Sequence, residues 1–110
     1  MLQLELDPRS AKHTAIVHCT GRIIFHEEAR TLLETVRALI ANHERVVLDL
    51  SAVRDVDSAG LGTFASLHIY AQQNGSSLVL RNPASFVRNI LELTQLDREL
   101  HVQSGSSMAA

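Results

Sequence analysis

The spacing of hydrophobic positions changes along the chain, and each change predicts a different element. Leu2, Leu4 and Leu6 alternate with polar residues, which is the period of a strand with one buried face. The apolar segment 14–20 predicts a second strand. Because the turn between the two segments is short, we expect them to pair as an antiparallel hairpin. Gly21 is expected to end the second strand.

From Glu27 onward, apolar residues recur three and four positions apart, which is typical of an amphipathic helix that covers a core. The segment 46–50 is short, rich in branched side chains and almost entirely apolar, so it predicts a strand covered on both faces. A predicted loop, 51–57, then leads into a second helix from about Ser58 to Asn74. The stripe of this helix expected to face the core is formed by Leu61, Phe64, Ala65, His68 and Ala71.

The last third of the chain predicts one more strand, 78–80, and one more helix. Asn82 and Pro83 are expected to open this helix, because Asn is a good N-cap and Pro suits the first helical position. The positions expected on its buried face are Phe86, Val87, Ile90, Leu91 and Thr94. Residues 96–102 are ambiguous, and they fit a short turn followed by a last edge strand. Residues 103–110 are small and polar, which predicts a flexible tail.

These elements predict an α/β fold in a single domain, residues 1–102. We expect a mixed β-sheet of four to five strands with the helices packed mainly on one face. A chain of 110 residues suits one domain. Hydrophobic residues make up 45% of it and aromatic residues 4%, so Leu, Val, Ile and Ala must build the core. Such a core suffices without metal or disulfide bonds.

Charge and cysteine usage narrow the function classes. The formal net charge is −2, so no basic excess is available to bind nucleic acid. The lone Cys19 cannot form an internal disulfide, which favours a reducing compartment. The N-terminus has no signal-peptide pattern, and no apolar run approaches the length of about 18 residues that spans a membrane. We therefore expect a cytoplasmic domain with no direct membrane insertion.

The segment 57–62, Asp-Ser-Ala-Gly-Leu-Gly, is the strongest candidate for chemistry. Gly60 and Gly62 are weak helix formers at the start of a predicted helix, where a missing side chain allows close approach of another group. Asp57 or Ser58 can cap this helix. A phosphate on Ser58 would meet free backbone N–H groups, while Asp57 would repel it. On the residues alone, the alternative is that Ser58 is simply a cap and the glycines only aid packing.

The segments 46–51 and 56–62 resemble the signature of the STAS family, the domain of sulphate transporters and anti-sigma-factor antagonists. The family pattern is a strand reading Val, an apolar residue, then Asp-Leu-Ser, followed by a loop and Asp-Ser-small-Gly-apolar-Gly. This sequence reads Val-Leu-Asp-Leu-Ser and Asp-Ser-Ala-Gly-Leu-Gly at those places. The resemblance extends to Gly21, Gly75 and the pair 82–83, and it spans nearly the whole chain.

The resemblance implies an anti-sigma-factor antagonist, which is a binding partner and a substrate rather than an enzyme. In such proteins the unmodified antagonist binds an anti-sigma factor that is also a serine kinase, and this binding frees the sigma factor for transcription. The kinase phosphorylates the serine after the Asp, which corresponds to Ser58, and phosphorylation ends the binding. A metal-dependent serine phosphatase restores it. We expect no cofactor in the domain itself and leave the oligomeric state open.

We expect the partner-binding surface to surround Ser58. Its other predicted members are Asp57, Ala59, Gly60, Leu61, Gly62, Arg22, Ile24, Phe25 and Asp55. Members of the family often carry an acidic residue soon after Gly21, but here no acid appears before Glu27. The apolar stretch indicates a more hydrophobic partner surface, with Phe25 as an anchor if it is exposed. It also favours an alternative, a STAS module that is not phosphorylated and serves a transporter complex or a stress-sensing assembly.

The sequence lacks the motifs of other catalytic and metal-binding sites. A hydrolase nucleophile elbow needs glycine two positions before the serine, where this chain has Val56. No Gly-Lys-Ser/Thr follows the glycine pair, so no phosphate-binding loop is predicted. The six histidines form no His-Glu-x-x-His pair, and a metal site is not expected. We interpret His68 as a partly buried core residue rather than a ligand. We interpret Asp49 as structural, with its carboxylate bonded to backbone in the loop near Ser58.

Overall fold

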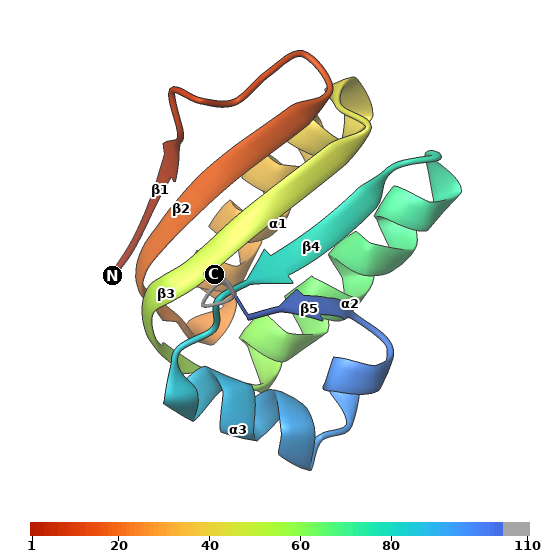
Figure 1. Ribbon diagram of the computed structural model, residues 1–110. Helices are drawn as coiled ribbons and strands as arrows, with labels where there is room; N and C mark the ends of the chain where they lie inside the picture. Colours follow the sequence, from red (N-terminus) through yellow and green to blue (C-terminus); the bar gives the residue numbers. More distant parts are fainter. Residues whose placement is uncertain (105–110) are drawn as a thin grey trace.

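The five strands lie side by side in the order in which they occur along the chain (Figure 1). This computed structural model describes residues 1–104. The elements are β1 (Leu2–Leu6), β2 (Thr14–Ile23), α1 (Phe25–Asn42), β3 (Arg45–Val56), α2 (Ser58–Gln73), β4 (Ser77–Arg81), α3 (Ser85–Leu93), a 3-10 turn η1 (Leu96–Arg98) and β5 (His101–Gln103). The predicted α/β fold with a mixed sheet is confirmed.

Strand pairing explains why one edge of the sheet carries the site. β1 is antiparallel to β2, whereas β2–β3, β3–β4 and β4–β5 are parallel. The carboxyl ends of β2 and β3 therefore lie at the same edge, and α1 and α2 begin there. Both helices lie against one face of the sheet, and α3 lies across its carboxyl edge (Figure 1).

The core forms where alternate strand residues meet the apolar stripes of the helices. The most deeply buried side chains include Ala15, Val17, Cys19, Leu32, Val36, Val46, Leu48, Leu50, Phe64, Leu67, Leu78, Leu80 and Leu91. Cys19 is a core residue, as predicted, and burial raises the pKa of its thiol to about 12. The α2 stripe differs from the prediction, because Leu67 is buried whereas Ala65 is only half-buried. His68 is half-buried, which agrees with its interpretation as a partly buried residue.

Two strands extend several residues beyond their predicted ends. β2 does not end at Gly21 but continues to Ile23, and its register against β3 shifts on both sides of Gly21. Gly21 has a φ of 110°, and a Cβ there would collide with the carbonyl oxygen of Met1, so this glycine permits a bulge rather than a strand end. The predicted loop 51–57 was also wrong, because β3 continues through it to Val56.

The third helix begins later than predicted. Asn82 is not its cap: it has a left-handed φ of 60°, and its N–H donates to the carbonyl oxygen of Gln103 at 2.6 Å. The helix starts at Ser85 and buries Val87 and Leu91, which lie one turn apart. Phe86 points away from that face and is 53% exposed, so its predicted burial was wrong.

The segment after α3 resolves the ambiguity of residues 96–102. It contains the turn η1 followed by the short edge strand β5, which pairs with β4. Gln103, which the sequence placed in the tail, is the last residue of this strand. Ser104 follows the strand without regular structure, and residues 105–110 of the predicted flexible tail lie outside the described residues.

Candidate functional site

The carboxylate of Asp57 fixes the start of α2. One carboxylate oxygen accepts a hydrogen bond from the backbone N–H of Gly60 at 3.1 Å, and the other accepts from the N–H of Phe25 at 2.9 Å. These two donors hold the pKa of Asp57 below its ordinary value. Asp57, rather than Ser58, is therefore the N-cap, and the same side chain ties the start of α2 to the start of α1.

Ser58 is the first residue of α2 and its side chain is exposed. Within the part of the chain that the structure describes, its hydroxyl makes no hydrogen bond, because Asp57 performs the capping. Ala59, the next residue, is half-buried. A modification of Ser58 would therefore leave the contacts of the folded domain intact.

The two glycines of the motif face opposite environments. A Cβ on Gly60 would collide with the carbonyl oxygen of Ile23 and lie 2.8 Å from a methyl group of Val56, so the interior of the domain requires this glycine. A Cβ on Gly62 would meet nothing within 4 Å. Gly62 is exposed, and the packing of the described residues gives no reason for a glycine there.

The apolar stretch after Arg22 divides into buried and exposed residues. Ile23 and Ile24 are buried, whereas Phe25 is 67% exposed. Phe25 also has a left-handed φ of 62°, a conformation that costs a non-glycine residue about 1–2 kcal/mol. Its hydrogen bond to Asp57 helps to hold this backbone. A bulky apolar side chain is thus presented to solvent beside the start of α2.

The remaining predicted site residues also differ in how far they are exposed to solvent. Arg22 and Asp55 are aligned in register on β2 and β3, with Arg22 exposed and Asp55 half-buried. Leu61 is half-buried and packs against the core. Of the ten predicted site residues, Gly60 and Ile24 are too buried to contact a partner directly, so they support the site from beneath.

A groove runs between α1 and α2 away from Ser58, and we call it the helix groove. Its first part has a volume of about 390 Å³ and is lined by His26, Ala29, Arg30, Leu33, Ser58, Ala59, Gly62, Thr63 and Ser66. Leu33 and Ser66 also line its second part, of about 380 Å³, together with Arg37, Ile69, Tyr70 and Gln73. The guanidinium of Arg37 lies 4.7 Å from the ring centroid of Tyr70. The sequence reasoning missed the α1 wall of this groove, although the stripe positions of the two helices were visible.

Asp49 belongs to a different cluster, on the sheet. One of its oxygens accepts from the backbone N–H of Ser51, and the other lies 3.0 Å from Nδ1 of His18. The Nε2 of the same histidine bonds to Asp7, whose carboxylate also binds Arg9. The structural role predicted for Asp49 is supported, but its main side-chain partner, His18, was not foreseen. We call Asp7, Arg9, His18 and Asp49 the His18 cluster.

The His18 cluster perturbs each of its ionisable members. The hydrogen bond from Arg9 is the main cause that holds the pKa of Asp7 well below its usual range, and the contact with Asp7 is the main cause that raises the pKa of His18. For Asp49, burial opposes ionisation, but hydrogen bonds from Ser51 and His18 lower its pKa overall. Two carboxylates therefore stabilise the imidazolium form of His18.

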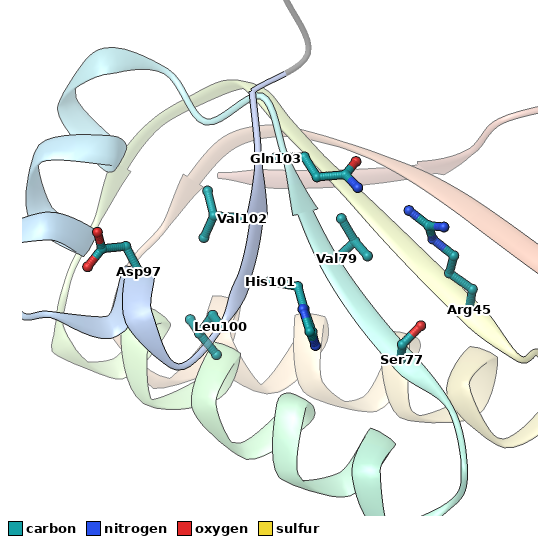
Figure 2. Close-up of a pocket in the computed structure, with 8 residues that line it drawn as sticks. All are labelled: Arg45, Ser77, Val79, Asp97, Leu100, His101, Val102 and Gln103. Atoms are coloured by element: carbon teal, nitrogen blue, oxygen red, sulfur yellow. The ribbon is translucent and has the colours of Figure 1, made fainter. Parts of the chain in front are cut away.

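A further pocket, of about 450 Å³, lies at the β4–β5 edge of the sheet (Figure 2). Its lining residues are Arg45, Ser77, Val79, Asp97, Leu100, His101, Val102 and Gln103. None of these belongs to the predicted site or to the His18 cluster. Across residues 1–104, no group of three or more His, Cys, Asp or Glu side chains is placed to hold a metal ion. No helix in the same range is long and apolar enough to cross a membrane.

Comparison with known proteins places this geometry in a family. The anti-sigma factor antagonist SpoIIAA in its unphosphorylated form is similar in structure, with a TM-score of 0.75 and 15% identity over 91% of this chain and 87% of that chain. An anti-sigma factor antagonist from Mycobacterium paratuberculosis has a TM-score of 0.75 and 25% identity over 94% and 86% of the two chains.

A third structure, a proposed anti-sigma factor antagonist from Thermotoga maritima, has a TM-score of 0.77 and 23% identity over 91% of this chain and 85% of that chain. The family model described as "Mlab, STAS domain" matches residues 6–103, which include the Asp57–Gly62 motif and both helices of the groove. The chain belongs to the STAS domain family.

Proposed function

We propose that this chain is an anti-sigma-factor antagonist whose binding is switched off by phosphorylation of Ser58. The observation that carries the proposal is the hydroxyl of Ser58, exposed and without a structural hydrogen bond in the described domain, at a helix start that Asp57 holds in place. The fold is also similar to that of SpoIIAA in its phosphorylated form, with a TM-score of 0.69 at 14% identity.

The proposed partner surface consists of the residues near Ser58 that face solvent. Phe25 supplies an exposed apolar anchor, and Ala59 and Gly62 leave space for close approach of a partner backbone. Arg22 and Asp55 lie at the margin of this surface. The partner is an anti-sigma factor with serine kinase activity, and a metal-dependent serine phosphatase reverses the modification in the cytoplasm. The chain itself acts as a substrate and a binding partner, not as an enzyme.

The switch follows from the charge of the phosphate. Phosphorylation adds nearly two negative charges at pH 7. Burying such a charge without a counterion in a protein interface costs several kcal/mol, and a loss of about 4 kcal/mol lowers affinity roughly a thousandfold. Because the Ser58 hydroxyl has no role in the fold, this change in affinity requires no unfolding of the domain.

One observation favours a second candidate function, a STAS module that is not phosphorylated and serves a transporter complex or a stress-sensing assembly. The stretch from Arg22 to Phe25 carries no acid, and Phe25 is exposed in a strained conformation. An apolar anchor of this kind serves permanent association as well as it serves a reversible partner.

Phosphopeptide mass spectrometry of the protein from its native cell distinguishes the two functions. We expect phosphate on the peptide that contains Ser58, and we expect its loss in a Ser58→Ala variant. Ser66, another exposed serine of α2, is an internal control that should remain unmodified. An unmodified Ser58 peptide in every growth and stress condition would overturn the switch and favour the permanent module.

A further inference from the structure

We infer that Arg30, assisted by His26, receives a phosphate placed on Ser58, so that phosphorylation closes the near end of the helix groove. This inference rests on the proposed function, because it concerns the modified state of Ser58. It adds an intramolecular contact to the switch: Arg30 would partly neutralise the phosphate, and the occupied groove would then exclude a partner together with the remaining negative charge.

The position of the residues supports this contact. The hydrogen bond from the N–H of Phe25 to Asp57 ties the start of α1 to the start of α2. His26 and Arg30 lie four positions apart on α1, so they lie on one face of that helix. Both line the same 390 Å³ hollow as Ser58, and they do so from the opposite wall.

The floor of the hollow leaves room for a phosphate. Its lining includes three small residues: Ala29 on α1, and Ala59 and Gly62 on α2. Arg30 is exposed, and its side chain is long enough to reach across such a hollow. A guanidinium can donate two parallel hydrogen bonds to phosphate oxygens, which makes arginine a strong partner for a phosphoserine.

The charges around the hollow are arranged for this pairing. In the described part of the chain, neither His26 nor Arg30 makes an ion pair, so both side chains are available. Two exposed acids of α1, Glu27 and Glu34, lie three and four positions from Arg30. The two oxygens of Asp57 already accept backbone hydrogen bonds from Gly60 and Phe25. A phosphate on Ser58 would therefore be repelled by Asp57 on one side and attracted by the guanidinium of Arg30 on the other.

Phosphorus-31 NMR on protein with phosphoserine encoded genetically at position 58 tests the inference. We expect the second pKa of this phosphate to lie below the value of about 6 for a free phosphoserine. Arg30→Gln should raise it by about 0.5 or more, because the opposite charge is removed. Arg37→Gln is the matched control: it removes the same charge from the same helix farther from Ser58, and it should leave the titration unchanged.

The nitrogen-15 spectrum of the Arg30 side chain provides a second readout. Its Nε–H signal should move on phosphorylation in otherwise unsubstituted protein. An identical phosphate titration in the parent protein and in Arg30→Gln, with an unmoved Nε–H signal, would overturn the inference. Since the phosphoserine is encoded, this result does not depend on a kinase, and a cell without Ser58 phosphorylation would contradict the proposed function alone.

Discussion

The start of α2 and the His18 cluster are both built on aspartates, but the aspartates have different partners. In the His18 cluster, side chains satisfy one another: Asp7 binds Arg9 and His18, and Asp49 also binds His18. At the start of α2, Asp57 accepts only from backbone N–H groups. In the His18 cluster the polar side chains are bonded to one another. At the start of α2 the carboxylate of Asp57 is bonded to backbone, and among the described residues the neighbouring side chains make no bond to it.

This difference distinguishes a structural cluster from the proposed recognition surface. The carboxylates of Asp7 and Asp49 are largely buried and already bonded within the cluster, so they offer little to a partner. Ser58 and Phe25 are exposed on a backbone that a single carboxylate holds in place. Preorganised backbone with free side chains reduces the entropy that a partner must remove on binding. The two glycines of the motif differ in a similar way, because the packing of the domain requires Gly60 whereas Gly62 faces open space.

The largest expected effect is the loss of stability in Gly60→Ala. The new methyl group would collide with the backbone carbonyl of Ile23, which cannot move without disturbing β2. We expect a loss of about 3 kcal/mol, at the upper end of the range for overpacking. Urea unfolding followed by circular dichroism measures it. A variant as stable as the parent would show that the α2 start is not anchored as described.

Phe25→Asn separates partner binding from domain stability. Asparagine tolerates the left-handed conformation and keeps the backbone N–H that bonds to Asp57, so stability should stay constant or rise by up to about 1 kcal/mol. Loss of the aromatic anchor should weaken partner binding about tenfold or more. The matched control is Phe86→Asn, since Phe86 is also exposed but lies on α3. Equal losses of binding in both variants would contradict a localised surface at Phe25.

Gly62→Ala should have the opposite effect on stability from Gly60→Ala. The new methyl group meets no atom of the domain, and alanine is a better helix former by about 0.5–1 kcal/mol. The melting temperature should therefore rise by a few degrees. If Gly62 allows close approach of the partner, binding should weaken in the same variant. A stabilised variant with full affinity would remove Gly62 from the surface.

The pH dependence of the His18 cluster gives the smallest expected effect, because His18 is partly solvent-exposed. Its folded pKa is raised, so its stabilisation is fully present below the unfolded value of about 6.5 and is lost as the pH rises through the folded pKa. The pKa of Asp7 is lowered, so its stabilisation is lost in acid. The gap in melting temperature between the parent and His18→Gln should be widest between about pH 4 and 6.5.

The same gap should narrow as the pH rises toward 9. His26→Gln is the control, since the side chain of His26 makes no hydrogen bond in the described domain. A gap for His18→Gln that stays constant from pH 5 to 9 would show that the charge of His18 does not stabilise the fold.

The sequence predicted the elements whose residues follow a regular period. The two long helices were found because their apolar stripes repeat every turn. The end of β3 was missed because a bulge opposite Gly21 breaks the alternation, and polar residues occupy its exposed face between Val53 and Val56. Periodicity carries no information about such a bulge, which depends on pairing with another strand.

The candidate site also contains features that the sequence predicts and features that it does not. The motif around Ser58 was recognised because its residues are contiguous. The backbone conformation of Phe25 was not predictable, because the carboxylate that holds it lies 32 residues away on Asp57. The His18 cluster likewise requires the register that aligns His18 with Asp49 on adjacent strands. Contacts set by register or by distant partners become visible only in the folded chain.

Calorimetric titration of a purified anti-sigma factor kinase from the same cell tests the central claim most directly. The parent protein and Ser58→Ala should bind it with similar affinity, because the hydroxyl makes no contact that the fold needs. Ser58→Asp should bind about a hundredfold more weakly or worse, a loss of roughly 2.7 kcal/mol, because it places a charge in the interface. Equal affinity of Ser58→Asp and the parent would contradict a charge-controlled switch at the start of α2.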